Sequence, residues 1–104
     1  MTQRSTEKTK HRMQRLNATG AQLNASNADF LKIDVETALI FCGLALETNN
    51  EEKKERNRKN ARKAYDTILQ LWGNVAFTPS QESYMHEMMH RLKGDLKRLG
   101  ERFD

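Results

Sequence analysis

Two histidines near the end of the chain have a spacing that supports metal or phosphate chemistry. His86, Glu87 and His90 form the pattern H-E-M-M-H. On a helix, side chains four residues apart project in similar directions, so two imidazoles could hold one zinc ion while the glutamate activates a bound water. His90 also begins the pattern H-R-L-K-G, in which Lys93 and Gly94 follow it. The two patterns give His90 different roles, and its place on the predicted helix separates them.

A helix is predicted over residues 79–99, around these histidines. Thr78 and Gln81 have the spacing of a capping box, and Gly100 suits a helix end. Apolar residues recur at intervals of three and four along the segment: Met85, Met88, Leu92, Leu96 and Leu99. At ~100° per residue, His90 lies away from this apolar stripe and faces solvent.

The surroundings of the histidines argue against a zinc protease. In the extended form of the zinc motif, a third histidine would stand at position 96, which is Leu96. Lys93 and Lys97 lie on the same side of the predicted helix as His90, and their charges disfavour a bound dication. No strand is predicted that could hold a peptide substrate. We therefore expect no metal, no cofactor and no enzymatic activity.

The second pattern carries a resemblance to a known family. His90, Leu92, Lys93 and Gly94, followed by a leucine–glycine pair at 99–100, resemble the phosphoacceptor helix of histidine phosphotransfer domains. The resemblance covers residues 90–100. It implies that His90 accepts a phosphoryl group from a response-regulator aspartate, that Lys93 neutralises phosphate, and that Gly94 leaves room for the partner. In that family another helix completes a four-helix bundle, and residues 101–104 are too few to form one.

Two further helices are predicted upstream. Apolar residues are almost continuous from Phe30 to Leu46, which is typical of a central helix packed on more than one side. Ser26 or Asn27 would cap this helix, and Gly43 would mark the close approach of another helix. The predicted range is 27–47.

The second of these helices is predicted over residues 51–72. Asn50 would cap it, and Gly73 would end it. Its first half is polar, whereas its second half is amphipathic, with Tyr65 and Trp72 expected in the core. No segment has the alternation of a strand. The predicted fold is all-α, an antiparallel three-helix bundle with a possible fourth segment from the N-terminal region.

Charge is unevenly distributed along the 104 residues, whose net charge is +4. Residues 1–20 contain five basic residues against Glu7, and residues 21–104 contain thirteen of each sign. We divide the chain into a basic arm over residues 1–25, disordered or partly helical, and a helical bundle over 26–104. The neutral bundle does not favour nucleic acid as the main partner. The single Cys42 fits a buried position in a cytoplasmic protein, and no apolar segment is long enough to cross a membrane.

One basic segment stands out within the bundle. Residues 53–63 hold seven basic residues and one acid, and the basic ones are candidates for an interaction surface: Lys53, Lys54, Arg56, Arg58, Lys59, Arg62 and Lys63. Such a run could contact an acidic partner or phosphate. A helix face exposed to solvent also accounts for this basic run, and it is the interpretation we favour.

The sequence N-A-R-K-A-Y-D-T-I-L at residues 60–69 resembles short bacterial all-helical proteins of unknown function, over residues 30–100. That resemblance implies a fold and no activity. We therefore predict a small non-enzymatic module for protein–protein interaction or regulation, whose partner is another protein and which could form a homodimer. Phosphotransfer through His90 is the alternative. Nucleic-acid binding through the basic arm and residues 53–63 is a weaker one.

Overall fold

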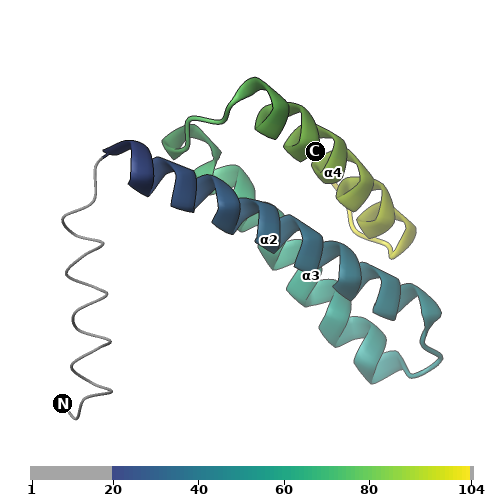
Figure 1. Ribbon diagram of the computed structural model, residues 1–104. Coiled ribbons are helices and arrows are strands. Elements are labelled where there is room, and N and C mark those ends of the chain that lie inside the picture. Colours follow the sequence, from purple (N-terminus) through teal and green to yellow (C-terminus); the bar gives the residue numbers. More distant parts are fainter. Residues whose placement is uncertain (1–19, 104) are drawn as a thin grey trace, which may run out of the picture.

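The computed structural model describes residues 20–103, with side chains described from residue 27 onward. These residues form three helices: α2 (Gly20–Glu47), α3 (Glu51–Leu71) and α4 (Pro79–Arg98) (Figure 1). A short 3-10 turn, η1 (Trp72–Asn74), follows α3. This part of the chain contains no strand, so the predicted all-α three-helix fold is confirmed. Residues 1–19, which include most of the predicted arm and any fourth segment, lie outside the described residues.

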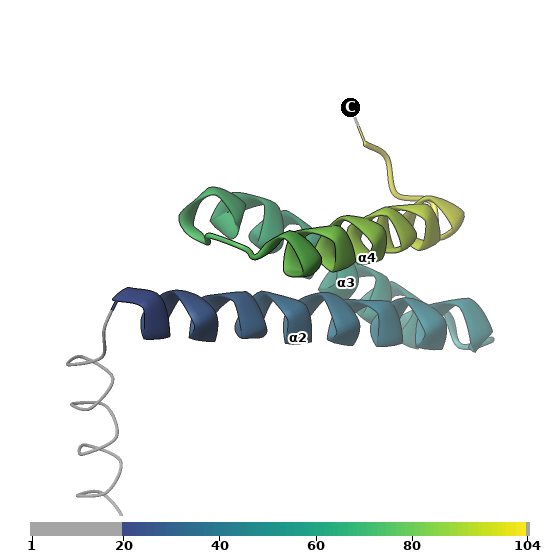
Figure 2. The same cartoon turned by 45° about the horizontal axis from the view of Figure 1, so that its top comes forward.

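The three helices follow one another in antiparallel order. α2 and α3 form a hairpin, and α4 returns along the hairpin on the same side of α2 as α3 (Figures 1 and 2). α2 contacts both of the other helices more extensively than they contact each other. It is therefore the central helix, as predicted. No described helix is long and apolar enough to cross a membrane.

α3 and α4 are capped by the side chains that the sequence predicts as N-caps. The Asn50 side chain accepts a hydrogen bond from the Lys53 backbone N–H at 2.9 Å. At α4, the Thr78 hydroxyl accepts from the Gln81 N–H at 3.2 Å, and the Thr78 N–H donates to the Gln81 side chain at 2.8 Å. These bonds satisfy amide groups that a helix start leaves without partners.

The helix ends agree with prediction only in part. Gly100 has a φ of 99° and ends α4 in a Schellman motif, with the Glu101 N–H donating to the Leu96 carbonyl at 2.9 Å. Gly73 was expected to play the same part for α3, and that expectation is wrong. Its φ is not positive, and it lies inside η1, so a tightened 3-10 turn ends the helix instead.

The predicted start of α2 is also wrong. Ser26 and Asn27 lie inside the helix, which already includes Gly20. Good helix formers separate the polar residues of this stretch, and a single serine or asparagine inside a helix costs only a few tenths of a kcal/mol, up to about 0.7. A potential cap is therefore not sufficient to start a helix when helical residues precede it.

The core lies between α2 and the other two helices. Its buried residues are Leu31, Val35, Ala38 and Cys42 of α2, Ala61, Tyr65 and Ile68 of α3, and Met85, Met88, Met89, Leu92 and Leu96 of α4. Burial, with the nearby negative charge of Asp95 as a lesser cause, raises the pKa of the Cys42 thiol to about 11. This thiol is therefore an inert core side chain at neutral pH.

After α4, residues 101–103 fold back against α3. The Phe103 ring packs edge-on against Tyr65, with 5.0 Å between ring centres. Glu101 forms ion pairs with both Arg58 and Arg62, and Arg62 also donates to the Arg102 carbonyl at 2.8 Å. This C-terminal segment therefore covers one edge of the core with both apolar and charged contacts.

Candidate functional site

The predicted phosphoacceptor region lines a groove between α3 and α4. The groove has a volume of about 480 Å³ and is lined by Tyr65, Leu69 and Trp72 of α3 and η1 and by His86, Met89, His90 and Lys93 of α4. The prediction that His90 and Lys93 share one side of the helix is confirmed. The tyrosine, leucine and tryptophan of this groove come from α3 and η1, whereas α4 supplies the two histidines, the lysine and Met89.

The two histidines of the groove have different surroundings. The His86 ring lies 5.1 Å from the Trp72 ring, and its Nε2 lies 3.5 Å from a Glu82 carboxylate oxygen. His90 is exposed and has no hydrogen-bond, ion-pair or ring partner among residues 27–103. The Lys93 ammonium lies 5.3 Å from the centre of the Phe103 ring. His90 is thus an accessible imidazole beside a lysine that the C-terminal segment holds.

Two details of this region bear on the sequence-based expectations. No group of three or more histidine, cysteine, aspartate or glutamate residues within the described part of the chain is arranged to hold a metal ion. Trp72, expected in the core, is only partly buried and forms one wall of the groove, in contact with Phe77 and His86. A 3-4 apolar pattern predicts which side of α3 Trp72 occupies, but not how deeply it is covered.

The basic run at residues 53–63 is divided by the C-terminal segment. Arg58 and Arg62 are turned toward Glu101, whose side chain is only 13% exposed. Lys59 lies 3.8 Å from Glu55. The other four candidates, Lys53, Lys54, Arg56 and Lys63, have no ion-pair partner within the described range. Two of the seven basic residues therefore support the fold, and the remaining charge is scattered along α3.

An exposed apolar face on α2 was missed by the sequence analysis. Four large side chains on one side of the helix are largely solvent-exposed: Phe30 (59%), Ile33 (58%), Ile40 (63%) and Leu44 (49%). At ~100° per residue they lie opposite the buried residues of the same helix. The buried residues of α2 pack against α3 and α4, and neither helix covers these four side chains. Figure 2 shows α4 running above α2 and α3 crossing behind it. We call these four residues the α2 face.

A signal for the α2 face is present in the sequence. The near-continuous apolar run contains two interleaved sets with 3-4 spacing, one buried and one exposed. The run was interpreted as packing on several sides, and three described helices supply only enough surface to cover one of the two sets. Counting the helices available against the apolar faces to be covered would have identified the excess face.

The α2 face continues onto the end of α3. Phe30 and Leu71 line a pocket of about 230 Å³, together with Leu31, Val75 and the side chains of Asn27 and Asn74. Leu71 is itself 37% exposed. The apolar surface is therefore wider at the Phe30 end than at the Leu44 end.

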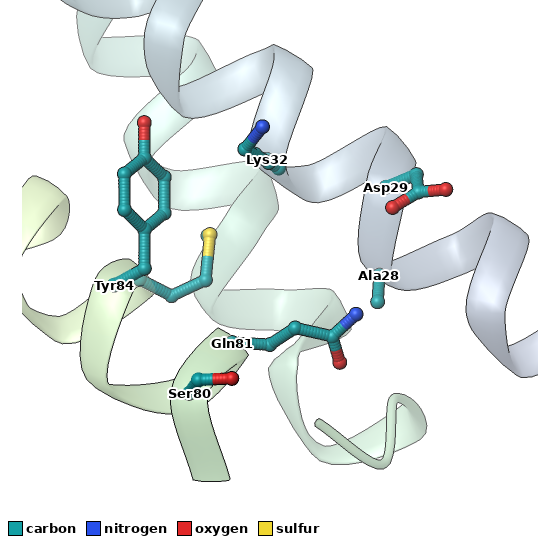
Figure 3. Close-up of a pocket in the computed structure, with 7 residues that line it drawn as sticks. Ala28, Asp29, Lys32, Ser80, Gln81 and Tyr84 are labelled. Atoms are coloured by element: carbon teal, nitrogen blue, oxygen red, sulfur yellow. The ribbon is translucent and has the colours of Figure 1, made fainter. Parts of the chain in front are cut away.

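A second small pocket lies between the start of α4 and α2 (Figure 3). It has a volume of about 210 Å³, and Asp29, Lys32, Gln81 and Tyr84 are among its lining residues. The Tyr84 hydroxyl donates to Glu36, which raises the pKa of Tyr84, and the Lys32 ammonium lies 5.6 Å from the Tyr84 ring centre. Gln81 is already used in the α4 cap. These polar groups connect α2 to α4, and we therefore assign the pocket a structural role.

Comparison of the chain with models of known protein families, with curated proteins and with solved structures found no match. Neither resemblance seen in the sequence gains support from these comparisons.

Proposed function

We propose that this protein is a protein–protein interaction module whose contact surface is the α2 face. The observation that supports this most directly is the exposure of Phe30, Ile33, Ile40 and Leu44 on a single side of one helix. The largest contiguous apolar patch on a monomeric protein is often functional, and such patches commonly mark sites of association.

The composition of the α2 face suits a partner surface. A phenylalanine and three branched aliphatic side chains can form the buried centre of an interface, where most of the binding energy is found. The residues are carried by a regular helix, so little conformational entropy is lost when a partner covers them.

Site-specific photo-crosslinking tests this proposal. A photoreactive amino acid replaces Ile40 in one variant and Lys59, an exposed residue of α3, in a matched control, and both are expressed in cells. We expect a discrete covalent adduct from position 40 and none from position 59. The absence of an adduct from position 40, or equal adducts from the two positions, contradicts the proposal.

A second candidate function is phosphotransfer through His90. It is supported by one observation, the accessible His90 imidazole in the same groove as Lys93. Lysine close to a phosphohistidine would offset its negative charge. Incubation with acetyl phosphate should then label the wild-type protein and leave His90→Gln unlabelled. His86→Gln is the matched control, and labelling of His90→Gln at the wild-type level excludes this function.

A further inference from the structure

We propose that the groove between α3 and α4 binds an acidic peptide segment of a partner protein, anchored by one aromatic side chain. The groove shares no residue with the α2 face, so the proposed function does not depend on it. The chain already holds a segment of this chemistry beside the groove, because Glu101 and Phe103 fold back against α3 and α4.

The C-terminal segment shows what the side chains beside the groove can bind. Its aromatic ring, Phe103, packs edge-on against Tyr65 with 5.0 Å between ring centres, and the Lys93 ammonium lies 5.3 Å from the centre of the same ring. Its acidic residue, Glu101, forms ion pairs with two arginines of α3. One end of the surface formed by α3 and α4 therefore holds an acid and an aromatic residue that are two positions apart in the sequence.

The groove continues this surface with side chains of the same kinds. Tyr65 and Lys93 line the groove and also contact Phe103. Beyond them the groove is lined by Leu69 and Trp72, and Leu69 is 51% exposed. Tryptophan is enriched among the residues that contribute most to binding at protein interfaces. Because the groove is continuous with a contact that the fold already makes, an occupant of the same chemistry fits it.

The polar groups of the groove favour an acidic occupant. Its described lining residues include His86, His90 and Lys93 and no acid. Ammonium and imidazole N–H groups are donors, and a carboxylate accepts from them in strong hydrogen bonds. Glu82 lies 3.5 Å from His86, so we expect the partner's carboxylate at the other end, beside His90 and Lys93. The contact of Lys93 with Phe103 leaves N–H donors of its ammonium group for that carboxylate.

The size of the groove suits one anchoring side chain and its neighbours. Its volume of about 480 Å³ lies within the ~300–1,000 Å³ typical of ligand pockets. An aromatic ring of the partner can pack against Trp72 and Leu69, and a pair of aromatic rings is stabilised beyond the apolar area that it buries. The contact is nevertheless small, so we expect a weak complex with half-saturation on the order of 100 µM.

Fluorescence titration of the full chain with a synthetic peptide tests the proposal. Trp72 is the single tryptophan of the chain, so its emission reports on the groove. The probe is a short peptide in which glutamates flank one phenylalanine. We expect a saturable shift of the emission to shorter wavelength, because the peptide removes water from the indole ring. Matched peptides with alanine for phenylalanine, or with glutamine for every glutamate, should require at least about tenfold higher concentrations for the same shift.

A pair of variants tests whether the peptide occupies the groove. Leu69→Asp places a negative charge among the lining residues and should weaken binding of the acidic peptide by at least about tenfold. Gln70→Asp adds the same charge at the next residue of α3, which is exposed and does not line the groove, and should change binding by less than about twofold. Circular dichroism checks that both variants fold. Equal weakening by the two substitutions overturns the groove as the binding site.

Other results of the titration would also overturn the proposal. An unchanged Trp72 emission up to about 1 mM peptide would exclude binding of this chemistry. Equal shifts with the glutamate and glutamine peptides would show that the groove does not select acids. A shift that follows protein concentration without peptide would identify a second copy of the chain as the occupant. Crosslinking from position 40 and phosphoryl labelling of His90 are measured independently, so failure here leaves both proposed functions standing.

Discussion

The guanidinium carbon of Arg62 lies 4.2 Å from the centre of the Phe103 ring. The same guanidinium group donates to Glu101 at 3.0 Å and to the Arg102 carbonyl at 2.8 Å. One side chain of α3 thus holds three consecutive residues that follow α4. This relationship connects residues about forty positions apart and closes the open edge of the bundle, which gives the C-terminal segment a measurable part in stability.

Phe103→Ala should lower the free energy of unfolding by about 1–2 kcal/mol. The substitution removes the ring contact with Tyr65 and the cation–π contact with Arg62, each contributing on the order of 1 kcal/mol. Urea denaturation followed by circular dichroism measures the change. Phe30→Ala, compared in dilute solution, should cost less than about 0.5 kcal/mol because its ring is mostly exposed. Equal losses from the two substitutions would show that the C-terminal segment does not stabilise the fold.

Thr78→Ala should destabilise the protein by about 1 kcal/mol, since the Gln81 amide loses its hydrogen-bond acceptor. Ser80→Ala, at the exposed second residue of α4, is the matched control and should change stability by less than about 0.5 kcal/mol. Urea denaturation of the three proteins gives the comparison. If Ser80→Ala lost as much stability as Thr78→Ala, the capping box would not be the cause of the loss.

Gly43→Ala should stabilise the fold by up to about 1 kcal/mol. Gly43 was expected to mark the close approach of another helix, but a methyl group added there meets no described atom within 4 Å, and alanine favours the helix more than glycine does. Urea denaturation followed by circular dichroism measures the change. Gly94→Ala, at an equally open glycine of α4, is the matched variant and should stabilise the fold by a similar amount. A loss of stability in Gly43→Ala alone would show that this glycine is needed for packing.

Cys42 should make stability fall between pH 9 and pH 11. The pKa of its thiol is raised from 9.0 to about 11, chiefly by burial, so the folded state retains its proton where the unfolded state loses it. The contribution of Cys42 is complete below about pH 9 and is lost as the pH rises toward about 11. Unfolding free energies measured against pH should therefore fall more steeply for the wild type than for Cys42→Ala. Parallel curves would show that the thiol is not perturbed.

Features with local causes were predictable from the sequence. The caps at Asn50 and Thr78 and the stop at Gly100 depend on groups within four or five residues of one another. The buried stripe of α4 follows from the 3.6-residue period alone. The role of Gly73 and the start of α2 were mispredicted because each local signal competes with neighbouring residues. A 3-10 turn ends α3 in place of a glycine cap, and a preceding helical stretch moves the start of α2 ahead of the predicted cap.

The candidate surfaces could not be predicted in full, because they depend on contacts between residues that are distant in the sequence. The solvent-facing position of His90 was predictable from its angle on the helix, but its place in a groove with Trp72 required α3 to lie beside α4. Glu101 pairs with Arg62 across thirty-nine positions and so removes charge from a run that looks continuous in the sequence. No spacing rule connects residues so far apart.

The sequence by itself determined the all-α class, the three helices of the described residues, the positions of most caps and the buried stripe of α4. It determined these features because hydrogen bonding and periodic burial act over one or two helical turns. Only the tertiary structure decided which apolar side of α2 is covered and which stays exposed. The physical reason is that chain reversals place α3 and α4 on one side of α2, and the face left uncovered is the surface on which the proposed function rests.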